Sequence, residues 1–318
     1  MDRIVYLLGA GASVNCIPVV EKLAEGFHEI GNLIVSPNEK LNVSSDQIEN
    51  VNLLSEQIRE LSKISKNRAS IDTVAKSYFL QKNDALLRQL KISLSAYILL
   101  QQKYNPVDWR YDLFLASIFK ESLTQIPENI KILSWNYDNQ FELAYNSFQR
   151  EHKFLGNRHE LKIFDKNSKI AHLVDSGFIY KLNGSAGVTF DKRNDSESYS
   201  LDVQMNSVLK EFMRLNEEPL LEPGISFAWE HPHLAEERLP MILANCKIIV
   251  TIGYSFPFFN RQIDKMIFEH ATKLEKVYIQ NPKASEIEEK LQNLIDPQRK
   301  IKFVQDLSTN EFMIPYEL

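Results

Sequence analysis

The chain has 318 residues, of which 44% are hydrophobic and 25% are charged, a balance typical of a soluble globular protein. Its net charge of −5 argues against a dedicated nucleic-acid-binding protein, which would carry a basic excess, so we expect no direct contact with nucleic acid. The two cysteines, Cys16 and Cys246, are too few for a thiolate zinc site or a disulfide framework. No apolar run reaches the roughly 20 residues of a membrane helix, and we expect a cytoplasmic protein without a membrane partner.

Six short apolar runs predict buried strands, and each run is continuous rather than alternating, as in parallel strands covered on both faces. They are residues 4–8, 130–135, 178–182, 248–252, 276–279 and 301–304. Helical patterns follow four of these runs, at residues 19–34, 139–150, 260–274 and 285–295. The repeated passage from strand to helix predicts an α/β fold with a doubly wound parallel sheet.

A different composition separates the first two strands. Residues 51–104 contain no glycine or proline and carry apolar residues at helical spacing. We therefore predict a helical subdomain over residues 36–125, inserted into a sheet domain formed by residues 1–35 and 126–318. Residues 190–240 are polar and contain four prolines, which predicts long loops and short helices.

Glycine is scarce, and its positions are informative. The chain has 10 glycines, about 3% of its residues against roughly 7% on average, and five of them lie in loops directly after predicted strands. These five are Gly9, Gly11, Gly184, Gly187 and Gly253. Because ligands of an open parallel sheet bind outside the carboxyl ends of its strands, such loops are candidates for a binding site.

The first loop, GAGAS at residues 9–13, joins a strand to a predicted helix. Its glycines let the backbone approach a pyrophosphate, and the amides of a helix N-terminus supply donors. Val14 stands where the usual dinucleotide fingerprint has a third glycine, and a tight turn capped by Ser13 is the alternative. In the second loop, Asn136 and Asp138 could orient a ribose or a nicotinamide amide, or could cap a helix.

The third and fourth loops also each have two possible interpretations from the sequence alone. Residues 181–187 contain Asn183 before a glycine, and this pair is also a strong signal for a type I′ hairpin. In the fourth loop, Gly253 permits close approach and Ser255 offers a hydroxyl. A turn in which Pro257 opens a helix explains the fourth loop equally well.

The order of the four loops, with Ile17-Pro18 after the first, resembles the SIR2-like family, and most closely its bacterial defence-associated branch. The resemblance extends from residue 9 to residue 257, essentially the whole sheet domain. It implies a Rossmann-like domain with a smaller inserted domain, and a binding site for NAD⁺. In this branch it implies hydrolysis of NAD⁺ to nicotinamide and ADP-ribose, which drains the cell's cofactor as an anti-phage defence.

The resemblance also implies roles for individual residues of this chain. Those implied to hold the diphosphate are Gly9, Ala10, Gly11 and Ser13. Those implied to face the nicotinamide ribose are Asn136 and Asp138. Those implied to line the ribose-phosphate path are Gly253 and Ser255, with Asn281 near the adenosine half.

Two departures from the family change the expected chemistry. The protein deacylases of the family carry a four-cysteine zinc module, which two cysteines cannot form, so we expect neither zinc nor deacylation. Asn183 stands where the family has its catalytic histidine, and an amide cannot accept a proton at neutral pH. Loss of a general base typically costs about 10²–10⁴-fold in rate. Nicotinamide leaves as a neutral pyridine without a general acid, however, and Asp138 could supply the basicity that hydrolysis needs.

These observations are compatible with three functions. The first is an NAD⁺ glycohydrolase whose catalytic residues are Asn136, Asp138 and Asn183. The second is a catalytically silent sensor that binds NAD⁺ or ADP-ribose. The third is an interaction protein that kept the fold and lost the ligand. We further expect a homo-oligomer or a protein partner that the sequence does not identify.

Overall fold

The computed structural model describes residues 3–40, 43–66, 70–119, 125–149, 154–166, 168, 176–200, 202–227 and 229–318. At its centre lies a seven-stranded sheet in the order β10-β9-β8-β1-β2-β4-β3, in which every neighbouring pair is parallel. The strands are β1 (Arg3–Leu8), β2 (Ile130–Ser134), β3 (Ile163–Phe164), β4 (Phe178–Lys181), β8 (Cys246–Ile252), β9 (Lys276–Gln280) and β10 (Lys302–Asp306). All six predicted strands are present in this sheet, which adds the unpredicted two-residue edge strand β3, and the three strands of the smaller second sheet were not predicted either. The α/β fold class with a Rossmann-like, doubly wound sheet is confirmed.

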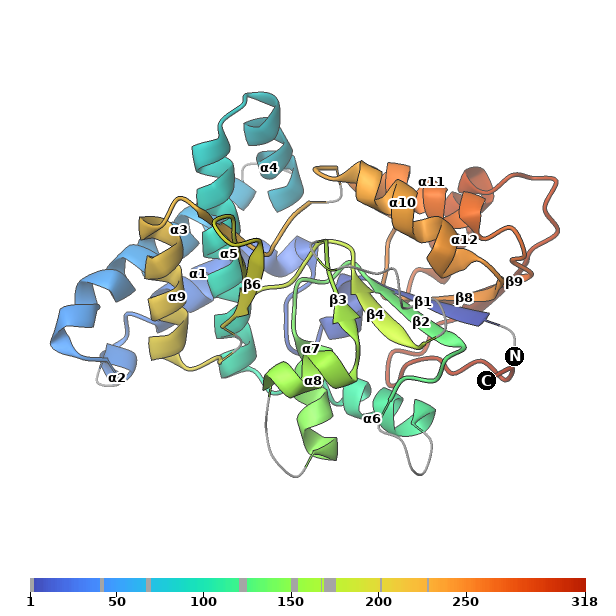
Figure 1. Cartoon of the computed structure of the whole chain (residues 1–318), viewed down its shortest axis with the longest axis horizontal. Helices are drawn as coiled ribbons and strands as arrows, with labels where there is room; N and C mark the ends of the chain where they lie inside the picture. Colours follow the sequence, from blue (N-terminus) through green and yellow to red (C-terminus); the bar gives the residue numbers. More distant parts are fainter. Residues whose placement is uncertain are drawn as a thin grey trace.

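Helices cover both faces of this sheet, as Figure 1 shows. Because side chains of a strand alternate between faces, Val5 and Leu7 of β1 pack on one side, whereas Ile4, Tyr6 and Leu8 pack on the other. The first side is covered by α10 (Pro232–Leu243), α11 (Arg261–His270) and α12 (Ala284–Leu294). The second side is covered by α6 (Trp109–Ile118) and α7 (Gln140–Tyr145). Burial on both faces explains why the strands are continuous apolar runs.

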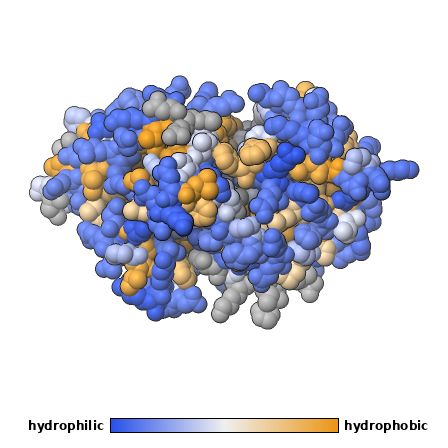
Figure 2. Space-filling view, turned by 90° about the horizontal axis from the view of Figure 1, so that it is seen from above, coloured by the Kyte–Doolittle hydropathy of each residue, from blue (hydrophilic) through white to orange (hydrophobic). Residues whose placement is uncertain are grey.

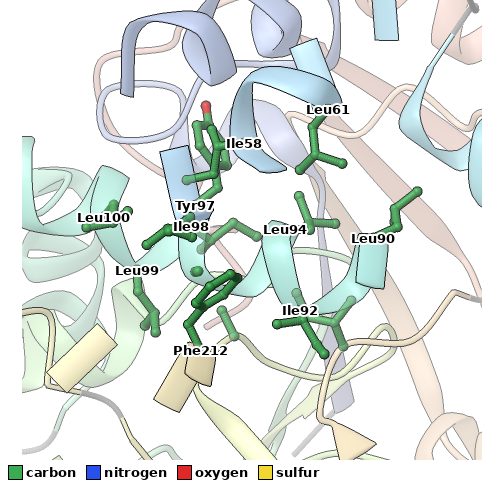
Figure 3. Close-up of a cluster of buried hydrophobic side chains, with 14 of the residues drawn as sticks. Ile58, Leu61, Leu90, Ile92, Leu94, Tyr97, Ile98, Leu99, Leu100 and Phe212 are labelled. Carbon is green, nitrogen blue, oxygen red and sulfur yellow. The ribbon is translucent and has the colours of Figure 1, made fainter. Parts of the chain in front are cut away.

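A layer of helices stands beside the sheet, at the left of Figure 1. It is built from α1 (Leu23–Leu33), α3 (Ile48–Lys66), α4 (Ile71–Leu80), α5 (Asp84–Tyr104) and α9 (Met205–Glu217). Every residue of α5 from 92 to 102 is buried, so this helix is surrounded on all sides. In Figure 3, Ile58 and Leu61 of α3 lie on one side of α5 and Phe212 of α9 lies on the other.

The layer does not coincide with the predicted boundaries of the insertion. α1 and α9 pack in it although they lie outside residues 36–125, and α6 packs against the sheet although it lies inside them. The prediction of long loops and short helices over residues 190–240 was wrong. This segment carries the 13-residue helix α9, whose apolar residues Met205, Val208 and Phe212 recur at helical spacing. The four prolines of the segment all lie after α9, at positions 219, 223, 232 and 240, so they do not interrupt this helix.

A second, antiparallel sheet of three strands lies beside the helical layer, in the order β6-β5-β7. Its strands are β5 (Val188–Asp191), β6 (Ser196–Tyr199) and β7 (Leu221–Pro223). The remaining short elements are α2 (Pro37–Lys40), α8 (Phe154–Glu160) and the 3₁₀ turns η1 (Ala10–Ser13), η2 (Val20–Lys22), η3 (Ser45–Gln47), η4 (Asn146–Phe148) and η5 (Phe258–Asn260). Both chain ends lie on the sheet side of the molecule in Figure 1.

The surface is mainly polar. On the face drawn in Figure 2, hydrophobic residues form small groups separated by hydrophilic ones. Within the part of the chain that the structure describes, no helix combines the length and the apolar content that crossing a membrane requires.

Candidate functional site

The four loops singled out in the sequence meet at one edge of the sheet. They lie directly after β1, β2, β4 and β8, which are adjacent parallel strands, so their carboxyl ends point the same way. From β1 the chain continues to β2 on one side and returns later to β8 on the other, which makes this edge the topological switch point. A cavity of about 340 Å³ opens there, within the roughly 300–1,000 Å³ that is usual for small-molecule sites.

Most of the residues predicted for the site line this cavity. They are Gly9, Ala10, Ser13, Asn136, Asp138, Asn183, Gly253 and Ser255. Gly11 and Asn281 are not among the lining residues. The Asn281 side chain instead supports the fourth loop from outside, because its Nδ2 donates to the Tyr254 carbonyl oxygen at 3.4 Å and its Oδ1 accepts from the Lys283 amide at 2.9 Å.

The glycines of the first loop allow its backbone to pass close to the backbone of the fourth loop. The Gly9 amide donates to the Ile252 carbonyl oxygen at 3.0 Å, and the Gly11 amide donates to the Gly253 carbonyl oxygen at 2.9 Å. A Cβ on Gly11 would lie 2.8 Å from the Gly253 Cα, closer than real side chains approach a backbone. Both glycine amides are therefore engaged within the protein and are not free donors for a diphosphate.

The first loop also differs from the prediction at its C-terminal end. It closes as the 3₁₀ turn η1, and α1 begins only at Leu23. The expected arrangement, in which the loop runs directly into an α-helix with its N-terminal dipole, is therefore absent. The Ser13 side chain does not cap a helix N-terminus, because Gly9 holds the N-cap position of η1.

The Ser13 hydroxyl joins the first and second loops. It donates to Asp138 Oδ2 at 2.7 Å and accepts from Asn136 Nδ2 at 3.1 Å. Because the Ser13 hydroxyl donates its hydrogen bond to the carboxylate, the Tyr111 hydroxyl, 2.7 Å from Ser13 Oγ, is the donor in the contact between the two hydroxyls. Asn136 Nδ2 also donates to the Gly9 carbonyl oxygen at 2.9 Å. These buried bonds fix the two predicted polar side chains of the second loop against the first loop.

Asp138 performs both a capping role and a role in the cavity. Its Oδ1 accepts from the Gln140 amide at 3.2 Å, near the start of α7, while its Oδ2 holds Ser13. Beneath it, the buried Lys181 Nζ donates to the Asp138 carbonyl oxygen at 2.5 Å. Burial lowers the pKa of Lys181, and the nearby Asp138 and Glu142 carboxylates oppose that shift. The backbone and the side chain of Asp138 are therefore both held in place.

Asn183 lies across the cavity from the first loop, and no hairpin forms at this position. β4 and β5 belong to different sheets, so the Asn183-Gly184 turn carries the chain from one sheet to the other. Asn183 Nδ2 donates to the Trp135 carbonyl oxygen at 3.1 Å. Its Oδ1 is buried and accepts no hydrogen bond from the described residues. Asn183 is one of the residues that line the cavity, although its Oδ1 is closed off from solvent.

The opposite wall comes mainly from residues that the sequence did not single out. The N-terminus of α4 contributes Ser70, Ile71 and Asp72, and α5 contributes Leu94 and Ile98. The segment between η1 and α1 adds Val20 and Glu21, together with Ile17 and Pro18 of the sequence motif, and Leu23 begins α1. These helices were predicted, but helical periodicity does not reveal which helix end closes over a distant sheet edge. The cavity thus combines apolar and polar side chains from both the helices and the sheet loops.

Only one sign of charge lines the cavity. Among the described residues its ionised side chains are the carboxylates Glu21, Asp72 and Asp138, and it is lined by no lysine, arginine or histidine. Burial raises the pKa of Asp72 to about 6. A cluster of carboxylates in a partly desolvated cavity creates a negative potential, which favours a positively charged group.

The fourth loop is anchored by a buried tyrosine–aspartate pair. The Tyr254 ring stacks on Trp135 with centroids 5.7 Å apart, and its hydroxyl lies 2.9 Å from each carboxyl oxygen of Asp264 on α11. Asn260 Nδ2 donates to the same hydroxyl at 3.0 Å. Burial raises the pKa of Asp264 well above its ordinary value of 3.8.

This raised pKa predicts a loss of stability with rising pH. Above pH 3.8 the unfolded chain releases the Asp264 proton while the folded protein still holds it, so the free energy of unfolding falls until the folded pKa is passed. We expect Asp264→Asn to remove this part of the pH dependence, because the amide stays neutral. Urea unfolding between pH 4 and pH 9 measures it. Glu269→Gln on the exposed face of α11 is the control, and an unchanged pH dependence in Asp264→Asn would contradict the prediction.

No protein-family model matches the chain, and no curated protein is significantly similar to it. Its function is therefore inferred from the cavity and its lining. The cavity brings together three serines, three asparagines and three carboxylates with apolar side chains, which is a set suited to a polar ligand with a flat cationic group.

Proposed function

We propose that the chain binds NAD⁺ in this cavity and hydrolyses it to nicotinamide and ADP-ribose, as a SIR2-like protein of the bacterial defence-associated type. The observation that carries the proposal is the convergence of the four loops, which resemble that family in sequence, on one cavity at the switch point of the sheet.

The lining supports this reaction in three ways. The nicotinamide ring of NAD⁺ and the ribosyl group in the transition state carry positive charge, and the carboxylates stabilise both. The apolar side chains of the lining, including Leu94 and Ile98, suit a flat aromatic ring. The Asn183 amide, which belongs to the lining, suits a ribose hydroxyl. The diphosphate would take backbone and hydroxyl donors, such as Ser255, because no lysine, arginine or histidine of the described chain lines the cavity.

Nicotinamide release from NAD⁺ by the purified protein tests the proposal. We expect Asn136→Ala to slow release by roughly 100-fold, since preorganised polar groups at a reacting centre are worth about that much. The control is Asn32→Ala, an exposed amide on α1. Both variants should keep the circular dichroism spectrum of the parent. Release by the parent protein that is no faster than by Asn136→Ala, in every oligomeric state, would exclude hydrolysis.

A catalytically silent NAD⁺ or ADP-ribose sensor is the second candidate, and Asn183 is the observation that favours it. This residue hydrogen-bonds and cannot take a proton. Calorimetric titration with NAD⁺ and with ADP-ribose separates the candidates. Binding of either ligand without turnover supports the sensor, and loss of a measurable turnover in Asn183→Ala excludes it. If neither ligand binds, the third function, an interaction protein that lost the ligand, remains.

The proposed setting is the cytoplasm of a bacterium under phage attack, with the protein acting as a homo-oligomer or with a protein partner. The proposal includes no thiolate zinc site, since Cys16 and Cys246 are separate, buried free thiols. Burial raises the pKa of Cys16 and of Cys246 to about 12, so neither is a ready thiolate ligand.

A further inference from the structure

Asp72 enters the cavity from the helical layer, on the wall opposite the sheet loops. It is the second residue of α4, lies two positions after the helix cap Ser70, and is half-buried. Ser70 and Ile71 line the cavity beside it. Its carboxylate accepts a hydrogen bond from its own backbone amide and, within the described chain, no side chain bonds to it. It is therefore a carboxylate with acceptor capacity left over.

The two other lining carboxylates differ from Asp72 in this respect. Both oxygens of Asp138 already accept hydrogen bonds, from the Ser13 hydroxyl and from the Gln140 amide. Glu21 is exposed at the mouth of the cavity, where water screens it. Only Asp72 combines partial burial with an open acceptor.

The groups that face Asp72 do not neutralise it. From the second and fourth loops these are the buried hydroxyls of Tyr137 and Tyr254, and Asp72 raises the pKa of both. On its own helix, Lys76 is directed elsewhere, with its Nζ over the rings of Phe79 and Trp229 at 5.0 and 4.5 Å. Glu21 and Asp138 add like charge across the cavity. Among the described residues no cation pairs with Asp72, and burial raises its pKa to about 6, close to the value at which a carboxylate is an effective base in the cell.

We propose that Asp72, which comes from the inserted helices, is the general base of the hydrolysis and accepts the proton that Asn183 cannot accept. This inference rests on the proposed function. In the step, the bond between nicotinamide and the ribose C1′ breaks, and nicotinamide leaves with the bonding electron pair as a neutral molecule. A water oxygen forms the new bond to C1′, its proton passes to the Asp72 carboxylate, and Asp72 then releases that proton to solvent.

The test compares Asp72→Asn with Asp84→Asn in NAD⁺ hydrolysis by the full chain. Both aspartates lie in the first turn of neighbouring helices, but Asp84 is exposed on α5 and does not line the cavity. We expect kcat/KM to fall by about 10²–10⁴-fold in Asp72→Asn, to be unchanged in Asp84→Asn, and to recover in part in Asp72→Glu. The parent protein should lose kcat/KM as the pH drops below about 6, and the residual activity of Asp72→Asn should not show this limb.

The outcomes separate the two proposals. If the parent hydrolyses NAD⁺ and Asp72→Asn keeps both the rate and the acid limb, the role of Asp72 is overturned and the proposed function stands. If the parent releases no nicotinamide, the proposed function and the role of Asp72 fall together. A variant that loses activity but also fails to bind NAD⁺ by calorimetry overturns the base role in favour of a structural one.

Discussion

Replacing Arg110 by methionine is expected to lower the free energy of unfolding by about 3–5 kcal/mol, because it strands a buried charge. The guanidinium bonds both carboxyl oxygens of Asp108, at 2.9 and 2.5 Å, and the two side chains are only 3% and 0% exposed. Its Nη2 also donates to the carbonyl oxygens of Gly11 and Ala12, at 3.2 and 2.9 Å. Without Arg110, the first loop loses its support along with the ion pair.

Urea unfolding of the variant measures this loss, and calorimetry with NAD⁺ measures the accompanying effect on the cavity. The control is Lys63→Met, which removes an exposed ion pair with Glu60 and should cost no more than about 1 kcal/mol. The double variant Arg110→Met with Asp108→Asn should recover part of the stability, since the stranded charge is gone. A loss below about 1 kcal/mol for Arg110→Met alone would show that Asp108 is compensated elsewhere.

The second large effect is expected for Gly253→Ala, which should lower the free energy of unfolding by at least ~2 kcal/mol and abolish the proposed binding of NAD⁺. Gly253 has a φ of +59°, a left-handed conformation that costs other residues about 1–2 kcal/mol. A Cβ there would also lie 2.4 Å from the Gly11 carbonyl carbon and 2.5 Å from the Ala12 amide nitrogen. These are backbone atoms, so only movement of the first or the fourth loop relieves the contact.

The matched control for this change is Gly156→Ala within the helix α8, where alanine is the better helix former and stability should not fall. Unfolding midpoints and NAD⁺ titrations of the two variants are compared with the parent. If Gly253→Ala keeps the stability and the binding of the parent, the backbones of the first and fourth loops are not in close contact, and the prediction is wrong.

The strands and the loops after them could be predicted because their signals are local. Val5 and Leu7 belong to a run of apolar residues that is buried on both faces, and five consecutive apolar positions are enough to predict such a strand. Gly9 and Gly253 stand directly after their strands, and strand order then brings those ends to one edge. The structural roles of the glycines could not be predicted in the same way. Gly11 is required by its crossing with Gly253, a contact between residues more than two hundred positions apart.

The α/β class, the six main strands and the polar residues at the strand ends could be predicted from the sequence, since each depends on neighbours within a few positions. That α4 and α5 close the cavity, and that Asp72 is one of the three carboxylates which are its charged groups among the described residues, became visible only in the folded protein. The physical reason is that periodicity specifies which face of a helix is buried but not which distant element it is buried against. Asp72 has the same local pattern as Asp84, and the fold alone places one in the cavity and the other in solvent.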